Sequence, residues 1–172
     1  MPANIEIKAR VADPAALMNR ALKIATAPPK TLLQTDTFFQ VPEGRLKTRE
    51  FPDGMAELIF YRRPDATGPK SSDYSISRTN DGAGLRQILS DSLGVRGVVA
   101  KRRILLMAGR TRIHLDEVEG LGSFMELEVV LEDGEDPAGG ESEAADLMKQ
   151  LEISPENLIS GAYIDLLERD RS

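Results

Sequence analysis

Charged side chains recur at every second residue in several segments of this sequence. Residues 4–10 read NIEIKAR, so polar and apolar side chains alternate. Because successive side chains of a β-strand point to opposite faces, such a strand has one charged face and one apolar face. The same alternation returns around Lys47 and Arg49, around Lys101 and Arg103, in residues 112–116, and in residues 126–128. Charged faces turned to the inside of a closed sheet would line a tunnel that binds ions. The alternative is an ordinary amphipathic sheet with its charges in solvent.

The charge balance of these faces indicates the kind of ligand. The predicted lining holds eight basic residues, Lys8, Arg10, Lys47, Arg49, Arg63, Lys101, Arg103 and Arg112. It holds four acidic residues, Glu6, Asp116, Glu126 and Glu128. The excess of four positive charges would be costly to bury without a partner. Planar guanidinium groups suit phosphate oxygens, so the pattern predicts a nucleoside triphosphate or inorganic triphosphate as ligand.

Carboxylates are the candidate metal ligands. Glu126 and Glu128 share one strand face about 7 Å apart at the backbone, close enough to converge on one divalent ion. The sequence has no cysteine and a single histidine, His114, which excludes a thiolate site and a zinc site built from histidines. Oxygen ligands predict Mg²⁺ or Mn²⁺. We interpret His114 as a hydrogen-bonding wall residue; a proton donor is the alternative.

Length and composition predict one domain over residues 1–172. The chain has 172 residues and a net charge of −6, which argues against nucleic-acid binding. We find no signal peptide and no apolar stretch of membrane-spanning length, so we expect a cytoplasmic protein without membrane contact. A monomer and a homodimer both remain open.

The periodicities predict an α+β fold. They indicate about eight strands in a mainly antiparallel sheet with helices as separate inserts, and a barrel whose charged faces line a tunnel is one way to arrange that sheet. The predicted strands are residues 4–10, 32–41, 45–51, 57–63, 72–78, 98–107, 111–118 and 124–131. The predicted helices are 15–25, 85–93 and 141–151, with a short one after Pro155 and a last segment over 162–169. Three amphipathic helices are available to cover the barrel. Residues 132–143 are acidic and rich in glycine and proline, which favours a solvated loop.

These motifs resemble the CYTH superfamily, the triphosphate tunnel metalloenzymes, over nearly the whole chain. The resemblance is carried by Glu6-Ile7-Lys8, Leu46-Lys47-Thr48-Arg49, the runs 99–103, 111–116, 120–122 and 126–128, and residues 161–167. It implies an eight-stranded antiparallel β tunnel, a closed or nearly closed barrel with a charged interior and helices packed outside. It implies a triphosphate clamped in this tunnel by Lys8, Lys47, Arg49, Arg63, Lys101, Arg103 and Arg112. It also implies metal ligation by Glu6, Glu126 and Glu128, with Asp116 assisting the metal. On this basis we predict Glu6, Lys8 and Asp116 as catalytic residues.

Two departures from the family pattern bear on the site. Asn4 stands where the first glutamate of the opening motif is usual, which puts a second metal ion in doubt. The basic residue that ends the strand over residues 57–63 is either Arg62 or Arg63.

The resemblance implies a metal-dependent enzyme that acts on triphosphates. The subgroup most similar to this chain is class IV adenylyl cyclase-like, which converts ATP to cyclic AMP and pyrophosphate. A triphosphatase acting on inorganic, thiamine or nucleoside triphosphate is the alternative. A non-catalytic polyphosphate- or nucleotide-binding protein is the third possibility.

Overall fold

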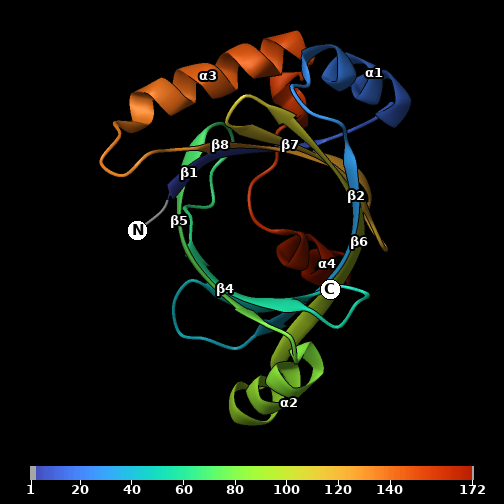
Figure 1. Ribbon diagram of the computed structural model, residues 1–172, viewed down its shortest axis with the longest axis vertical. Helices are drawn as coiled ribbons and strands as arrows, with labels where there is room; N and C mark the ends of the chain where they lie inside the picture. The colour runs from blue at the N-terminus through green and yellow to red at the C-terminus, as the bar shows by residue number, and fades with distance from the viewer. Residues whose placement is uncertain (1–2, 172) are drawn as a thin grey trace.

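Eight antiparallel strands form a closed barrel in the computed structural model, which describes residues 3–171 (Figure 1). The order around the barrel is β1-β5-β4-β3-β2-β6-β7-β8. The strands are β1 (Ala3–Arg10), β2 (Lys30–Phe39), β3 (Arg45–Glu50), β4 (Ala56–Arg62), β5 (Lys70–Thr79), β6 (Val95–Ala108), β7 (Thr111–Val118) and β8 (Gly122–Val130). Together with the helices outside it, this barrel confirms the predicted α+β fold with an eight-stranded antiparallel tunnel.

The helices are α1 (Pro14–Ile24), α2 (Gly82–Leu93), α3 (Pro137–Gln150) and α4 (Tyr163–Arg171), with a 3-10 turn over Pro155–Asn157. Helix α1 begins as its sequence predicts, because the Asp13 side chain accepts a hydrogen bond from the Ala16 amide at 3.1 Å. Among residues 3–171, no helix combines the length and the apolarity that crossing a bilayer requires.

The prediction of a loop over residues 132–143 was wrong at its C-terminal end. Helix α3 begins at Pro137, and the Asp136 side chain caps it by accepting a hydrogen bond from the Ala138 amide. Gly140, which suggested a loop, is a packing residue. A Cβ built on it would lie 2.7 Å from the Leu131 side chain and 2.8 Å from that of Ile5. The glycine therefore lets α3 approach the barrel closely.

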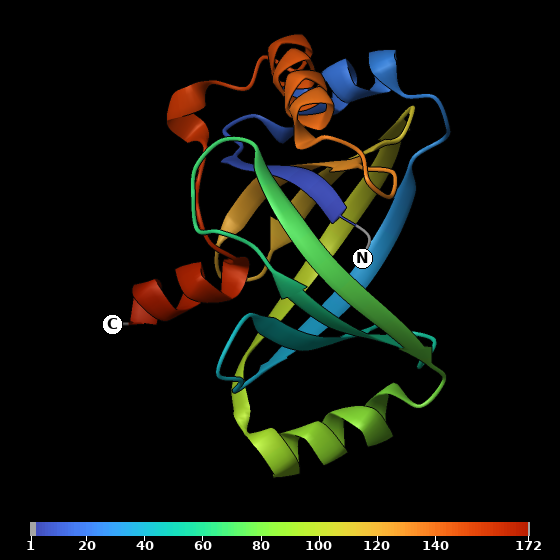
Figure 2. The same cartoon turned by 90° about the vertical axis from the view of Figure 1, so that its left-hand side faces the viewer.

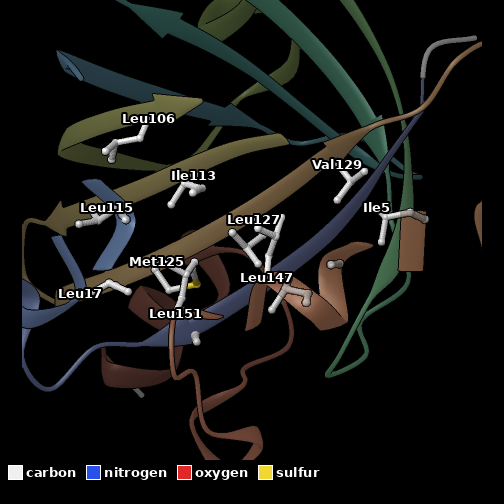
Figure 3. Packing of buried hydrophobic residues seen from close by; sticks show 14 of the residues in the cluster. Ile5, Leu17, Leu106, Ile113, Leu115, Met125, Leu127, Val129, Leu147 and Leu151 are labelled. Atoms are coloured by element: carbon white, nitrogen blue, oxygen red, sulfur yellow. The ribbon is translucent and has the colours of Figure 1, made fainter. Parts of the chain in front are cut away.

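The main apolar core lies outside the barrel, under α1 and α3 (Figure 3). The outward side chains of β1, β7 and β8 meet apolar residues of the two helices there. This core includes Ile5, Ile7, Leu17, Leu106, Ile113, Leu115, Met125, Leu127, Val129, Leu147 and Leu151. The inner faces of the same strands carry the charged residues, as the alternation predicted.

Helices α2 and α4 do not cover the main apolar core outside the barrel. Helix α2 lies beside β2 and β3 at the side of the barrel opposite α1 and α3 (Figure 1), and Ile88 is 65% exposed. The chain after α3 crosses one end of the barrel, and α4 lies at that end (Figures 1 and 2). Tyr163 and Ile164 pack there in a second apolar cluster with Phe38 and Phe124. The C-terminal segment therefore reaches the charged interior.

Candidate functional site

The interior of the barrel contains a cavity of about 620 Å³ with a charged wall. Among the described residues, eight basic side chains and five carboxylates line it. The basic residues are Lys8, Lys47, Arg49, Arg63, Arg78, Lys101, Arg103 and Arg112, and the acidic ones are Glu6, Asp36, Glu57, Glu126 and Glu128. The structure therefore brings together most of the residues that the sequence analysis selected, with a net excess of positive charge.

Two selected residues lie elsewhere. Arg10 is exposed at the last position of β1 and does not line this cavity; its guanidinium lies 5.3 Å from the centre of the Phe124 ring. Asp116 is buried behind the lining. It accepts two hydrogen bonds of 2.7 Å from Arg103 and a third of 2.7 Å from the Tyr163 hydroxyl. Both carboxylate oxygens of Asp116 are thus occupied by protein donors.

The structure decides that Arg63, directly after β4, faces inward, whereas Arg62, the last residue of β4, does not. Arg63 lines the cavity and donates to Glu6 at 2.7 Å and to the Gly161 carbonyl at 2.7 Å. Arg62 is exposed, 3.8 Å from Glu43. Burial and the charge of Glu128 raise the pKa of Glu6, although Arg63 opposes them. The 2.7 Å contact between Arg63 and Glu6 is an ion pair that holds the two side chains together at the wall.

Glu126 and Glu128 on β8 form the acidic centre of the cavity with His114 on β7. One ligand atom from each of these three residues lies within 4.8 Å of the others. Lys8 lies 3.2 Å and Arg103 3.4 Å from Glu126, and Arg112 lies 3.4 Å from Glu128. Burial would raise the pKa of Glu126, but Lys8 and Arg103 outweigh it and hold that pKa well below the ordinary value. This cluster is the best candidate for a metal centre.

Asp36 on β2 is a buried residue of the site that the sequence analysis missed. It accepts hydrogen bonds from Arg49, twice at 2.8 Å, from Lys47 at 2.8 Å and from Lys101 at 2.9 Å. Burial would raise the pKa of Asp36, but these three cations hold it well below the ordinary value. The alternation in β2 did place Asp36 and Phe38 on one face, yet a single acid beside a phenylalanine gave no charge pattern to recognise.

Several buried polar atoms of the wall lack a hydrogen-bond partner among the described residues. Four of them belong to residues that line the cavity: Asn4 Oδ1, Gln34 Oε1, Arg63 Nε and His114 Nδ1. Buried polar groups are rarely left without a partner in native proteins. The unpaired atoms therefore indicate that this interior binds a ligand or ordered water.

Part of the wall is apolar or aromatic. One stretch of it is formed by β4, β5 and the turn after β3, through Phe51, Ile59, Tyr61, Tyr74 and Ile76, and β2 and β6 add Leu32, Phe38, Val99 and Leu105. Such a surface suits the organic part of a ligand whose phosphates contact the cations.

The comparisons with known proteins agree with this architecture. A protein of Methanocaldococcus jannaschii named "putative adenylate cyclase" is 28% identical over 176 residues, which cover 94% of this chain and 97% of that protein. A solved structure from Pyrococcus horikoshii has a TM-score of 0.84 at 22% identity, covering 95% of this chain and 98% of that one.

A Hippeastrum protein described as a "putative adenylyl cyclase" with a dominant triphosphatase activity has a TM-score of 0.65 at 16% identity, covering 94% of this chain and 91% of that one. At these identities the two structural likenesses show the fold alone. The family model for the CYTH domain matches residues 2–163. The chain therefore belongs to the CYTH domain family.

Proposed function

We propose that the barrel interior binds the triphosphate group of a small organic molecule and catalyses metal-dependent attack on one of its phosphorus atoms. The observation that carries this proposal is the convergence of eight basic side chains on one cavity that holds only five carboxylates. A ligand with several negative charges would neutralise the excess. Membership of the CYTH family and the activities named for its structural relatives support the same assignment.

The basic residues would act as a preorganised clamp. Arg103 is almost completely buried and keeps its charge beside Asp116, so water screens that charge little. Burial lowers the pKa of Lys8 and Lys101, and a phosphate group beside them would favour their charged forms. Neighbouring carboxylates hold several of the cations: Asp36 holds Lys47, Arg49 and Lys101; Asp116 holds Arg103; Glu6 holds Arg63. We therefore assign Glu6 and Asp116 first to positioning Arg63 and Arg103. Charges fixed in advance stabilise a phosphoryl-transfer transition state without reorganisation.

The residues present fit a divalent metal ion. Glu126 and Glu128 supply anionic oxygens in one cluster with the unpaired Nδ1 of His114. We propose Glu126 and Glu128 as ligands of Mg²⁺ or Mn²⁺. When bound, the ion supplies positive charge that polarises a phosphoryl oxygen or a water molecule. Lys8, which lies between Glu126 and the Gly161 carbonyl, would contact the phosphate group beside this position.

Two reactions fit this arrangement. In cyclisation the 3′-hydroxyl oxygen of ATP attacks the α-phosphorus, and pyrophosphate leaves with its charge on the basic wall. The name of the M. jannaschii relative and the apolar wall beside the cations favour this reaction. In hydrolysis a water molecule attacks the terminal phosphorus and orthophosphate leaves. The activity described for the Hippeastrum protein favours hydrolysis.

Phosphorus NMR separates these reactions in one experiment. Purified protein is incubated with ATP, inorganic triphosphate or thiamine triphosphate, each with Mg²⁺ or Mn²⁺. Pyrophosphate with a cyclic phosphodiester signal identifies cyclisation, whereas orthophosphate identifies hydrolysis. If the phosphorus resonances of the ligand shift but no product forms, the protein binds triphosphates without catalysing their reaction, and the enzymatic proposal fails. If the resonances do not shift and no product forms, triphosphate binding is contradicted as well.

The clamp predicts that triphosphate binding weakens at alkaline pH. Burial and the charge of Arg49 lower the pKa of Lys47 to about 8, so this lysine loses its proton between pH 7 and pH 9 in the free protein. Because only the charged form attracts phosphate, metal-free affinity for ATP should fall about tenfold across this range. Calorimetric titrations at pH 7, 8 and 9 would measure the decrease.

Lys47→Arg is expected to reduce this pH dependence, because arginine keeps its charge. Lys70→Arg is the matched control. Lys70 also has a pKa lowered to about 8, by burial and by Arg63, but it does not line the cavity and binds the Ala66 carbonyl. If ATP affinity falls equally between pH 7 and pH 9 in Lys47→Arg and in the unaltered protein, Lys47 does not contact the triphosphate.

A further inference from the structure

We infer that His114 is a metal ligand and that it makes this site prefer Mn²⁺ to Mg²⁺. The inference rests on the proposed function, because it concerns the ion that assists triphosphate chemistry. It assigns to His114 a role other than the wall residue that the sequence suggested. Three independent features carry it: the spacing of the donor atoms, the unpaired nitrogen and the loose ion pairs of the two glutamates.

The strand register places the three ligands together. His114 on β7 lies directly opposite Glu126 on β8, and Glu128 follows two residues later on the same face. The Nδ1 atom is 3.7 Å from Glu126 Oε2 and 3.6 Å from Glu128 Oε1. Both separations are too long for hydrogen bonds. Two donors that bind one ion at about 2.1 Å lie about 3 Å apart, so small side-chain movements would complete the site.

The Nδ1 atom of His114 is free to bind an ion, because no described residue hydrogen-bonds to it. His114 is 5% exposed, and its Nδ1 has no hydrogen-bond partner among residues 3–171. Buried polar atoms are rarely left unpaired in native proteins. A metal ion between His114 and the two glutamates would satisfy the nitrogen directly.

The ion pairs of Glu126 and Glu128 are longer than those of Glu6, Asp36 and Asp116. Their contacts to Lys8, Arg103 and Arg112 measure 3.2–3.4 Å. The carboxylates of Glu6, Asp36 and Asp116 hold their partners at 2.7–2.9 Å, and Asp116 also binds the Tyr163 hydroxyl. Of these five carboxylates, Glu126 and Glu128 therefore lose the least when they turn to an ion. Glu57 also has a long ion pair, 3.3 Å to Arg78, but it does not belong to the cluster around His114. The cations that Glu126 and Glu128 release could then contact phosphate oxygens, so ion and triphosphate should strengthen each other's binding.

The mixed donor set decides the preference between ions. Mg²⁺ is a hard ion that favours oxygen ligands, whereas first-row transition ions accept imidazole nitrogen more readily. A site with two carboxylates and one imidazole therefore favours Mn²⁺ over Mg²⁺. A site built from carboxylates alone would prefer Mn²⁺ over Mg²⁺ less strongly.

The single histidine makes a direct test possible. Tag-free protein is mixed with MnCl₂ and inorganic triphosphate, and pulsed EPR records the nuclei coupled to the bound Mn²⁺. Because triphosphate contains no nitrogen and His114 is the only histidine in the chain, a ¹⁴N coupling typical of ligating imidazole has one source. We expect this coupling in the unaltered protein and its loss in His114→Gln. Bound Mn²⁺ without ¹⁴N coupling, or no bound Mn²⁺ at all, would overturn the inference.

Affinity measurements test the selectivity. Calorimetry should show that His114→Gln weakens Mn²⁺ binding about tenfold and Mg²⁺ binding by less than about threefold. Glu117→Gln is the matched control, because Glu117 is exposed on the outer face of the same strand and should leave both affinities unchanged. Equal losses for both ions would refute the selectivity.

The same spectra separate this inference from the proposed function. A ¹⁴N coupling without any ³¹P coupling would support the metal site and count against triphosphate binding at it. A ³¹P coupling without ¹⁴N would leave the triphosphate proposal standing and remove His114 from the ligands.

Discussion

Glu128→Gln is expected to lower metal-dependent turnover at least about 100-fold while the barrel stays folded. The amide keeps the shape of the side chain but removes the negative charge that the proposed metal site needs. The fold should tolerate the change, because within residues 3–171 the Glu128 side chain is hydrogen-bonded only to Arg112, at 3.4 Å. Initial rates of phosphate or pyrophosphate release at saturating ATP and MnCl₂ would measure the loss.

The control for this prediction is Glu117→Gln, which removes the same charge from the outside of β7. Its rate should stay within about twofold of the unaltered protein. Glu128→Gln should still bind triphosphate without metal, because the eight basic residues of the wall remain. Full turnover by Glu128→Gln would exclude Glu128 from the metal centre.

Asp36→Asn is expected to destabilise the free protein by about 3 kcal/mol and to tighten triphosphate binding about tenfold. The substitution leaves Lys47, Arg49 and Lys101 close together without their shared carboxylate. Repulsion among these cations, and the loss of charge-assisted hydrogen bonds, cost stability in the free state. The ligand then no longer competes with Asp36 for the three cations, so its phosphates bind more strongly.

Two measurements test these opposite effects. Urea unfolding gives the change in the free energy of unfolding, with and without inorganic triphosphate, and metal-free calorimetry gives the affinity. Asp73→Asn, an exposed change on β5, should alter neither quantity appreciably. Weaker triphosphate binding by Asp36→Asn would contradict the prediction. It would mean that Asp36 acts mainly by positioning the three cations, and not by competing with the triphosphate for them.

Alternation along the strands, together with the resemblance to the CYTH superfamily, made the barrel predictable from sequence. A strand with one charged and one apolar face can bury the apolar face outside, under helices, while the charged face lines the interior of a closed sheet. In β1, β7 and β8 the apolar side chains of Ile5, Ile113 and Leu127 do lie under α1 and α3. The same periodicity placed Lys8, Lys101 and Arg103 on the wall of the cavity. Local pattern sufficed because the side-chain period of a strand is set by the backbone.

Only the tertiary structure decided which charges pair across the barrel. Arg49 and Asp36 meet because they lie opposite each other on the paired strands β2 and β3. Arg63, directly after β4, meets Glu6 on β1 although β4 and β1 do not pair. The carbonyl of Gly161, from the last segment of the chain, also reaches Lys8 and Arg63. Contacts of this kind depend on strand order and closure, which local spacing does not encode.

The sequence by itself determined the barrel, its charged interior and most of the basic residues that line it. The structure decided that Arg63 and not Arg62 faces inward, that Arg10 lies outside the cavity, and that Asp36 belongs to its wall. It also gathered His114, Glu126 and Glu128 into one cluster. The physical reason is that periodicity fixes the face of a side chain, while its partner across the cavity is fixed only when the sheet closes and the strands adopt their register.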